Sequence, residues 1–262
     1  MQKHPKISII IPTLKRPESL ERCLKSIGKQ TYPNYEVVLV EEEGSLATLR
    51  NQGALRAKGD ILIFTDDDVV VSRDWLKSIV ASFSSSPDIG GVSGPALITP
   101  EFRRNRDIFS QTWAKYLYDV FFCEGKQHLP GHITSSGAWT TGAAEPDCSY
   151  EGEVHFLEAC NMAFRADIFY TLGGFNEAYK GIGDWSEPDL SFRVRRAGYR
   201  LWFSRDARLE HQPSRSGAFK KRKADSSQRM ANYELFSRTW IKPCLMHTLY
   251  KLFMRVYYEI KG

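Results

Sequence analysis

Ile61-Leu62-Ile63-Phe64-Thr65-Asp66-Asp67-Asp68 is the stretch that decides the fold of this 262-residue chain. Four apolar residues run directly into three carboxylates, a pattern typical of a buried strand that ends at the edge of a sheet. In α/β proteins that edge binds ligands. Three adjacent carboxylates repel one another unless positive charge lies between them, and a divalent cation held by oxygen ligands would supply it. The alternative is a solvated acidic turn before the helix that begins near Trp75.

The segments on the N-terminal side of this stretch alternate between strand and helix patterns. Residues 7–11 and 36–40 are rich in β-branched side chains and predict strands, whereas apolar residues at helical spacing predict helices from Pro17 and over 46–57. Such alternation predicts βαβ units, and therefore an α/β fold with a Rossmann-like mixed, mainly parallel sheet flanked by helices. Glu41–Glu43 and Asp66–Asp68 both follow parallel strands, so we expect them at the same edge.

The pattern changes after a predicted helix at 74–83 and a strand at 89–93. From Gly94 to about Glu153 only one amphipathic helix is expected, with a broad apolar stripe from Ile108 to Phe121 on which Trp113 should be packed. A long irregular insertion is uncommon unless it has a function. Regular structure is expected again over residues 156–164, 165–172, 187–197, 200–204 and 207–210.

Cysteine content and hydropathy indicate a cytoplasmic protein. The five cysteines are scattered and odd in number, which argues against a disulfide framework or a zinc site and for a reducing compartment. The first apolar run is too short for a signal peptide, and no run is long enough to span a bilayer.

Positive charge is concentrated in residues 215–262. They contain 11 Lys or Arg and 3 Asp or Glu, a net charge of +8, which leaves −3 on residues 1–214 from the total of +5. Since the body is not basic and lacks nucleic-acid-binding motifs, we expect no nucleic-acid partner. Lys220–Lys223 and the apolar residues of 245–256, interleaved with Lys251 and Arg255, predict a basic amphipathic tail. It would contact the inner face of a membrane peripherally; alternatively it packs on the domain or on a second subunit, as in a homodimer.

Several motifs occur in an order that resembles family 2 glycosyltransferases, the inverting nucleotide-sugar transferases with a GT-A fold. The resemblance covers most of residues 6–212 and makes 1–214 the catalytic domain, with an acceptor-side insertion. Glu42 and Glu187 stand where the family commonly has Asp. The matching motifs are Ile9–Thr13, Glu42–Ser45, Arg50–Gly53, Ala57–Asp60, Asp66–Asp68, Cys160–Arg165, Gly173–Glu177, Glu187–Arg193 and Arg196–Tyr199.

The resemblance implies that a sugar passes from a nucleotide-diphosphate donor to a hydroxyl of a glycan or a lipid-linked acceptor. Asp66 and Asp68 lie on one side of an extended chain and can reach one point. Asp68 is implied to bind Mg²⁺ or Mn²⁺, and Asp66 the ribose or the metal. His211 is a third metal ligand or a structural histidine.

The other donor-side candidates are Pro12, Thr13, Glu42, Arg50 and, less directly, Asp67. Glu42 should face the nucleobase, unless it belongs to a solvated loop. Arg50 could meet the diphosphate, hold Glu42 or be exposed on its helix. No Gly-rich phosphate loop accompanies these residues, so a metal is the economical way to neutralise a diphosphate.

Glu187 is the candidate general base for the acceptor hydroxyl. Asp189 is the second candidate and Asp184 a weaker one, because carboxylates at a helix start also serve capping. On the acceptor side we place Asn161, and Trp139 and Trp185 as loop residues that could stack on sugar rings.

Two other functions stay open. A sugar-phosphate nucleotidyltransferase would need a Gly-rich loop with a catalytic Lys after the first strand, where this chain has residues 12–17 as Pro-Thr-Leu-Lys-Arg-Pro. The second is a catalytically inactive, membrane-bound scaffold of the same fold. It stays open because Glu42 and Glu187 replace the Asp that the family commonly has at these two positions.

Overall fold

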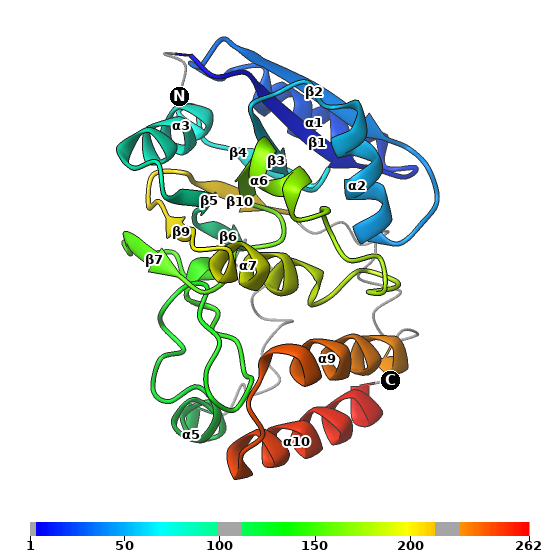
Figure 1. Ribbon diagram of the computed structural model, residues 1–262, viewed down its shortest axis with the longest axis vertical. Coiled ribbons are helices and arrows are strands. Elements are labelled where there is room, and N and C mark those ends of the chain that lie inside the picture. The colour runs from blue at the N-terminus through cyan, green and yellow to red at the C-terminus, as the bar shows by residue number, and fades with distance from the viewer. Residues whose placement is uncertain (1–3, 99–111, 213–225, 262) are drawn as a thin grey trace.

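The computed structural model describes residues 4–98, 112–212 and 226–261 (Figure 1). The part of the predicted stripe before Thr112 and the basic run Lys220–Lys223 lie outside these residues. The strands are β1 Ile7–Pro12, β2 Tyr35–Val40, β3 Ile61–Phe64, β4 Val69–Val71, β5 Ile89–Ser93, β6 Ala96–Ile98, β7 Gly152–Val154, β8 Met162–Arg165, β9 Arg200–Phe203 and β10 Leu209–His211. The helices are α1 Pro17–Ile27, α2 Leu46–Arg56, α3 Trp75–Ser85, α5 Thr112–Phe122, η1 Gly142–Ala144, α6 Ala166–Thr171, α7 Ser186–Arg196, α9 Ser226–Trp240 and α10 Leu245–Lys261.

A seven-stranded mixed sheet forms the centre of the molecule, in the order β2-β1-β3-β8-β5-β9-β7. β1 pairs in parallel with β2 and β3, and β5 with β9, whereas β8 runs antiparallel to β3 and β5 and β7 runs antiparallel to β9. The expected βαβ start and the mixed α/β class are confirmed. The carboxyl ends of β2 and β3 therefore meet at one edge.

A second, three-stranded sheet has the order β4-β10-β6. Its register pairs His211 of β10 with Val69 of β4, one residue after Asp68. This pairing brings the end of the last strand to the acidic cluster.

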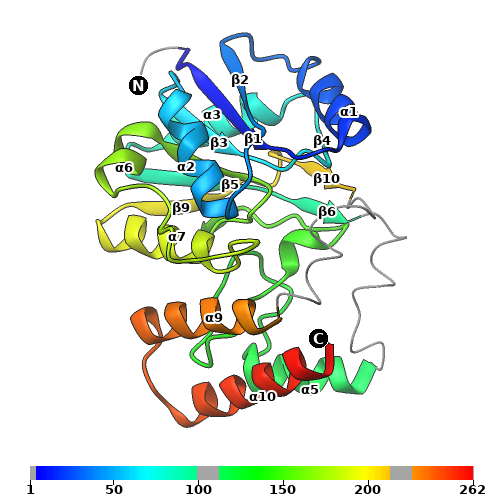
Figure 2. The same ribbon diagram turned by 90° about the vertical axis from the view of Figure 1, so that its right-hand side faces the viewer.

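The two faces of the large sheet carry separate cores. Alternate strand residues point to opposite faces, so Ile9 and Ile63 pack with α1 and α3, whereas Ile10 and Phe64 pack with α2, α6 and α7. Figure 2 shows these helices on both sides of the strands. Covering both faces explains why β3 is apolar at every position.

The C-terminal helices share a third core with residues 1–214. α9 packs on α7, and α10 packs on α9 and α5, around an aromatic cluster that includes Trp185, Tyr233, Phe236 and Tyr250. The described part of the predicted tail is therefore packed on the body. In both views α5 and α10 lie at the end of the molecule opposite α1 and β2 (Figures 1 and 2).

The expectation that Trp113 is packed is wrong. Its side chain is 66% exposed, because α5 contacts α10 through Tyr118 and Phe122 and turns its other apolar residues outward.

Among the described helices, none is both long enough and apolar enough to span a membrane.

Candidate active site

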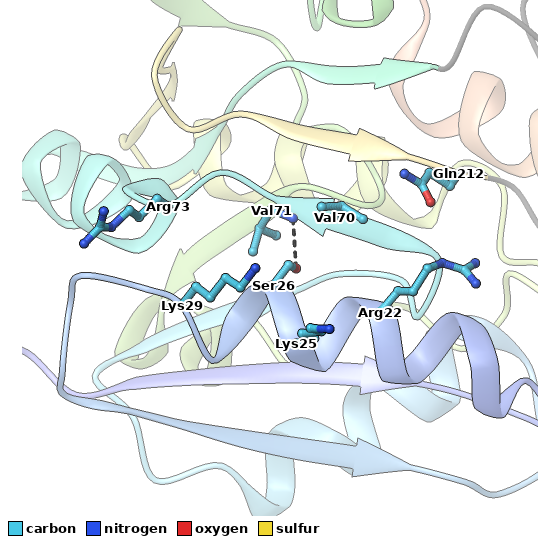
Figure 3. Close-up of a pocket in the computed structure, with 8 residues that line it drawn as sticks. All are labelled: Arg22, Lys25, Ser26, Lys29, Val70, Val71, Arg73 and Gln212. Carbon is cyan, nitrogen blue, oxygen red and sulfur yellow. Dashed lines mark hydrogen bonds between the residues drawn. The ribbon is translucent and has the colours of Figure 1, made fainter.

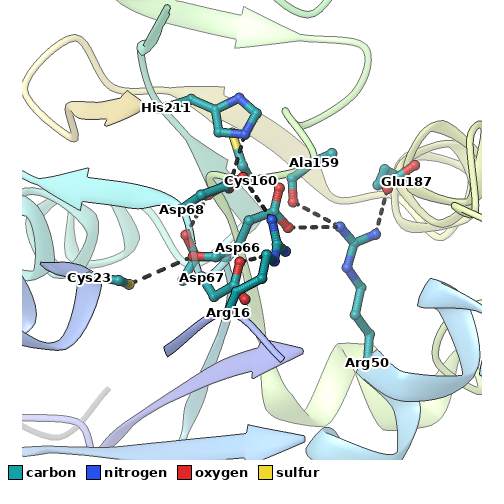
Figure 4. Close-up of polar contacts among 11 residues, drawn as sticks. Arg16, Cys23, Arg50, Asp66, Asp67, Asp68, Ala159, Cys160, Glu187 and His211 are labelled. Carbon is teal, nitrogen blue, oxygen red and sulfur yellow. Dashed lines mark hydrogen bonds and ion pairs between the residues drawn. The ribbon is translucent and has the colours of Figure 1, made fainter. Parts of the chain in front are cut away.

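The acidic cluster follows β3 directly. The hydroxyl of Thr65 donates to the carbonyl of Cys160 at 2.7 Å, which ties the end of β3 to the segment before β8. Beyond it the chain turns, and Asp66, Asp68 and His211 present ligand atoms that all lie within 4.8 Å of one another (Figure 4). The predicted convergence of the two outer carboxylates is confirmed, and the tertiary fold adds the imidazole.

The donor set of this cluster fits a divalent metal. His211 Nε2 lies 3.1 Å from Asp68 Oδ1, so each is already oriented toward a common point. Carboxylate oxygens suit Mg²⁺ and Mn²⁺, and an imidazole nitrogen is a ligand of transition metals. The three residues present can hold such an ion.

Arg16 is a residue of this cluster that the sequence interpretation missed. Its guanidinium lies 2.5 Å from Asp67 Oδ1 and 3.0 Å from Asp68 Oδ2. Lys15 has a positive φ of 54°, and this turn after β1 directs Arg16 back to the sheet edge. Part of the positive charge that the three carboxylates need is thus supplied by the protein. An arginine between the first strand and the first helix was the available signal.

Asp67 and Thr13 hold each other instead of facing a ligand. Thr13 donates its hydroxyl to Asp67 Oδ2 at 2.6 Å, and Asp67 is 0% exposed. Burial raises the pKa of Asp67 to about 6, although Thr13 and Arg16 lower it. Thr13 and Pro12 are buried as well. The expectation of direct donor contact at Asp67 is therefore corrected: its carboxylate serves the packing of β1 against the turn after β3.

Arg50 connects the acidic cluster with Glu187. It is 0% exposed, donates to Glu187 Oε1 at 2.5 Å and to the carbonyl of Ala159 at 3.2 Å, and lies 3.9 Å from Asp66 Oδ1 (Figure 4). Its Nε has no hydrogen-bond partner in the described part of the chain. The readings of Arg50 as exposed or as the partner of Glu42 are wrong, because α2 turns it into the sheet edge.

Glu187 is buried at the start of α7. Burial raises the pKa of its carboxyl above the ordinary value, while the charge and hydrogen bond of Arg50 oppose that shift. A carboxylate with a raised pKa, next to a cluster that can bind a cation, is suited to accept a proton from a hydroxyl.

The two other candidate bases already have partners on α7 and α9. Asp189 accepts from Arg193 Nε and from Trp240 Nε1, both at 2.9 Å, and so anchors α9 on α7. Asp184 pairs with Arg229 of α9 at 2.5 Å. Both carboxylates are used in packing the C-terminal helices.

The predicted acceptor-side residues are packed to different degrees. Asn161 is 1% exposed. Its Oδ1 accepts from Trp75 Nε1 and its Nδ2 donates to the carbonyls of Pro95 and Ala207, so it is a core residue. Trp185 is also 1% exposed, with the rings of Trp139, Tyr233 and Phe236 around it. Because both side chains are covered, neither presents a face to an acceptor. Trp185 was predicted to be open because it lies in a loop, but residues of α9 cover it. Trp139 is half-buried.

Glu42 lies on the rim, after β2. Its side chain is 43% exposed and pairs with Arg56 of α2. Contact with a nucleobase stays a prediction for this residue.

A cavity of about 590 Å³ lies between α1 and β4, apart from the acidic cluster (Figure 3). Neither the cluster's carboxylates nor Glu187 line it. No acidic residue is among its lining residues, which are Arg22, Lys25, Ser26, Lys29, Val70, Val71, Arg73 and Gln212. The helical spacing of the basic residues on α1 was visible in the sequence, but no candidate residue lies there.

Comparison with known proteins places this site in a family. Residues 8–43 and 41–173 match the profile described as "Glycosyl transferase family 2". The chain is 26% identical to the O-antigen biosynthesis protein RfbC of Myxococcus xanthus over 91% of its own length, but spans only 20% of that protein. It is 22% identical to glucosyl-dolichyl phosphate glucuronosyltransferase of Haloferax volcanii, over 79% of this chain and 69% of that one.

Solved structures with the GT-A fold superpose on nearly the whole chain. One is mannosyltransferase PcManGT from Pyrobaculum calidifontis, solved in complex with GDP-Man and Mn²⁺, with a TM-score of 0.58 at 19% identity. The superposition includes 99% of this chain and 71% of that one. GalNAc-T7, solved with UDP, GalNAc and Mn²⁺, has a TM-score of 0.66 at 16% identity, over 53% of its length and 100% of this chain. The fold is thus that of the GT-A glycosyltransferases.

Proposed function

Because this chain belongs to glycosyltransferase family 2, we propose that it is a metal-dependent, inverting enzyme that moves a sugar from a nucleotide-diphosphate donor to a hydroxyl acceptor. The observation that carries the proposal is the Arg50 bridge, which sets a buried carboxylate, Glu187, beside the Asp66, Asp68 and His211 cluster. The relatives' names favour an acceptor in cell-surface glycan synthesis, either a glycan or a lipid-linked sugar.

The donor would be held at the acidic edge. Asp66, Asp68 and His211 would bind Mg²⁺ or Mn²⁺, which when present neutralises the departing nucleoside diphosphate. A terminal nitrogen of the Arg50 guanidinium lies 3.9 Å from Asp66 Oδ1, so its positive charge would add to that of the metal beside a donor diphosphate. Mn²⁺ accompanies the nucleotide or nucleotide sugar in both solved relatives.

Glu187 would take the proton of the acceptor hydroxyl as that oxygen attacks the anomeric carbon. One bond forms between the acceptor oxygen and this carbon, and the bond to the diphosphate oxygen breaks. A single displacement of this kind inverts the anomeric configuration.

The C-terminal segment would hold the enzyme peripherally on the cytoplasmic face of a membrane. Its net charge of +8 supports attraction to anionic lipids. A homodimer through the same segment is the alternative.

The test is the variant Glu187→Gln, which keeps the size of the side chain but removes its basicity. We expect transfer to fall by about two to four orders of magnitude, while binding of the donor, measured by calorimetry with Mn²⁺, survives. Asp189→Asn serves as the comparison, and its main effect should be on thermal unfolding because that carboxylate anchors α9. Retained turnover in Glu187→Gln would exclude this residue as the base.

The donor is identified by screening UDP-, GDP- and dTDP-sugars for hydrolysis with Mn²⁺ and with a chelator as control. Chelator-sensitive hydrolysis of one donor supports the proposed function. No hydrolysis of any donor would favour the inactive scaffold.

A further inference from the structure

Exposed large apolar side chains are concentrated on two neighbouring helices. Among the described residues, five of the twelve belong to α5 and four to α10. They are Trp113, Tyr116, Leu117, Val120, Phe121, Leu245, Leu249, Leu252 and Val256. Scattered exposed apolar residues are ordinary, but a contiguous group marks an interaction site.

The two helices form one continuous surface, which we name the α5–α10 surface and define by these nine residues. Ring centroids of Phe122 and Tyr250 lie 5.2 Å apart, and those of Tyr118 and Phe253 5.5 Å apart, so the helices are in contact beneath it. Figure 2 shows α5 and α10 side by side at one end of the molecule.

A groove of about 340 Å³ runs between these helices. It is lined only by apolar and aromatic side chains: Trp113, Leu117, Tyr118, Phe121, Phe122, Met246, Leu249 and Phe253. With no charged residue in its wall, the groove suits a hydrocarbon chain and not a sugar or a nucleotide.

Charge and residue type favour an anionic lipid surface as the occupant. Trp113 and Tyr116 are the residue types that settle at the boundary between headgroups and acyl chains. Lys251 and Arg255 lie on α10, Arg255 being paired with Glu234 of α9, and the described residues 226–261 contain six Lys or Arg against two Asp or Glu. A second copy docked on this surface would bring its own basic residues against these and be repelled. Anionic headgroups would instead attract the basic residues.

We propose that the α5–α10 surface lies in the interface of an anionic membrane and that its groove takes one hydrocarbon chain of a lipid. The underside of the surface reaches the active site through ring contacts from Tyr250 to Tyr233 at 5.7 Å and from Tyr233 to Trp185 at 5.0 Å. Trp185 directly precedes α7, which carries Glu187. A role of this surface in receiving a lipid-linked acceptor rests on the proposed function. Binding of lipid by the surface does not depend on it.

The test uses the full chain and vesicles of phosphatidylcholine with or without phosphatidylglycerol. The double variant Phe121→Glu/Leu252→Glu changes two exposed positions, and Leu55→Glu is the matched control because Leu55 is exposed on α2, outside the surface. We expect the wild-type protein and the control to cosediment with anionic vesicles, and binding of the double variant to be weaker by about tenfold or more. Hydrolysis of a soluble donor should be equal in all three, so a failure of lipid binding and a failure of the catalytic proposal are distinguishable.

Three outcomes would overturn the membrane assignment. The first is equal vesicle binding by the double variant and the wild type, and the second is no vesicle binding by the wild type. The third is a wild-type dimer that the double variant turns into a monomer, which would make the surface an interface between copies.

The groove is tested separately with lipids brominated on the acyl chain, which quench nearby tryptophans. Trp113→Phe should remove a quenched component of the fluorescence that the wild type shows. Unchanged quenching in this variant would overturn the assignment of the groove to a hydrocarbon chain.

Discussion

Arg50 joins the two halves of the proposed site. Its side chain is fully buried, and the same guanidinium contacts Glu187 of α7 and approaches Asp66 after β3. A buried charge without its partner is costly, so removing one member of such a pair lowers stability by about 3–5 kcal/mol. Arg50 therefore has a structural role and also sets the protonation of the candidate base.

We predict that Arg50→Met moves the acid limb of the pH profile of kcat/KM to higher pH. Burial raises the pKa of Glu187 and Arg50 opposes that shift, so without the guanidinium the pKa rises further. A general base works only when deprotonated, and transfer at a given acidic pH must therefore fall. The profile of the folded variant is compared with that of Arg56→Met, which removes an exposed guanidinium from Glu42. An unchanged acid limb in Arg50→Met would contradict the coupling.

A second prediction concerns the metal ligands. Mn²⁺ should raise the unfolding free energy of the wild type by about 2.7 kcal/mol at 100 times its Kd. Asp68→Asn should lose most of this gain, because it removes a charged ligand from the Asp66, Asp68 and His211 cluster. Thermal unfolding with and without Mn²⁺ measures the effect, and Asp206→Asn, at an exposed site, is the control. Equal stabilisation of Asp68→Asn and the control would argue against this metal site.

At the scale of elements, α2 is held against the sheet at Gly53. A Cβ on this residue would meet side-chain atoms of Ile10 and Val40, which belong to β1 and β2. The absence of a side chain lets the helix approach the sheet, and this approach places Arg50, one turn earlier, beside Glu187.

We predict that Gly53→Ala destabilises the protein although alanine is the better helix former. Overpacking against Ile10 and Val40 should lower the free energy of unfolding by about 1–3 kcal/mol, more than the gain in helix propensity of up to about 1 kcal/mol. Urea unfolding measures the change. Gly28→Ala is the control, because its nearest contact would be 3.4 Å away and its φ is −62°. A more stable Gly53→Ala protein would show that α2 can move away without cost.

At the scale of the whole molecule, the C-terminal helices complete the structure around α7. Tyr233 and Phe236 of α9 cover Trp185, and Trp240 donates to Asp189 in the first turn of α7. The position of Glu187 thus depends on residues near the end of the chain.

We predict that Phe236→Ala lowers the free energy of unfolding by about 3–5 kcal/mol and also reduces kcat/KM for transfer. The substitution leaves a cavity beside Trp185, which directly precedes α7. Chemical unfolding and transfer are measured with Leu55→Ala as the control, since that leucine is exposed, lies outside the α5–α10 surface and should change stability by less than about 0.5 kcal/mol. If stability fell in Phe236→Ala but kcat/KM did not, α9 would have no part in positioning Glu187.

The sequence by itself determined the central sheet and one half of the site. Apolar runs with strand and helix periods are local signals, so β1 to β3, α1 and α2 could be predicted within a few residues. The i, i+2 spacing of Asp66 and Asp68 likewise predicted that they converge. Glu187 was singled out by its motif and its place at the start of a predicted helix.

Only the tertiary structure decided which partners these residues have. Arg50 and Glu187 are 137 positions apart, and Arg16 reaches Asp68 across 52. Such contacts depend on how elements stack, and no local period encodes that. For the same reason Trp185 and Trp113 were placed wrongly: an apolar side chain shows that a residue can be buried, but the packing of α9 and α10 determines that Trp185 is covered and Trp113 is not.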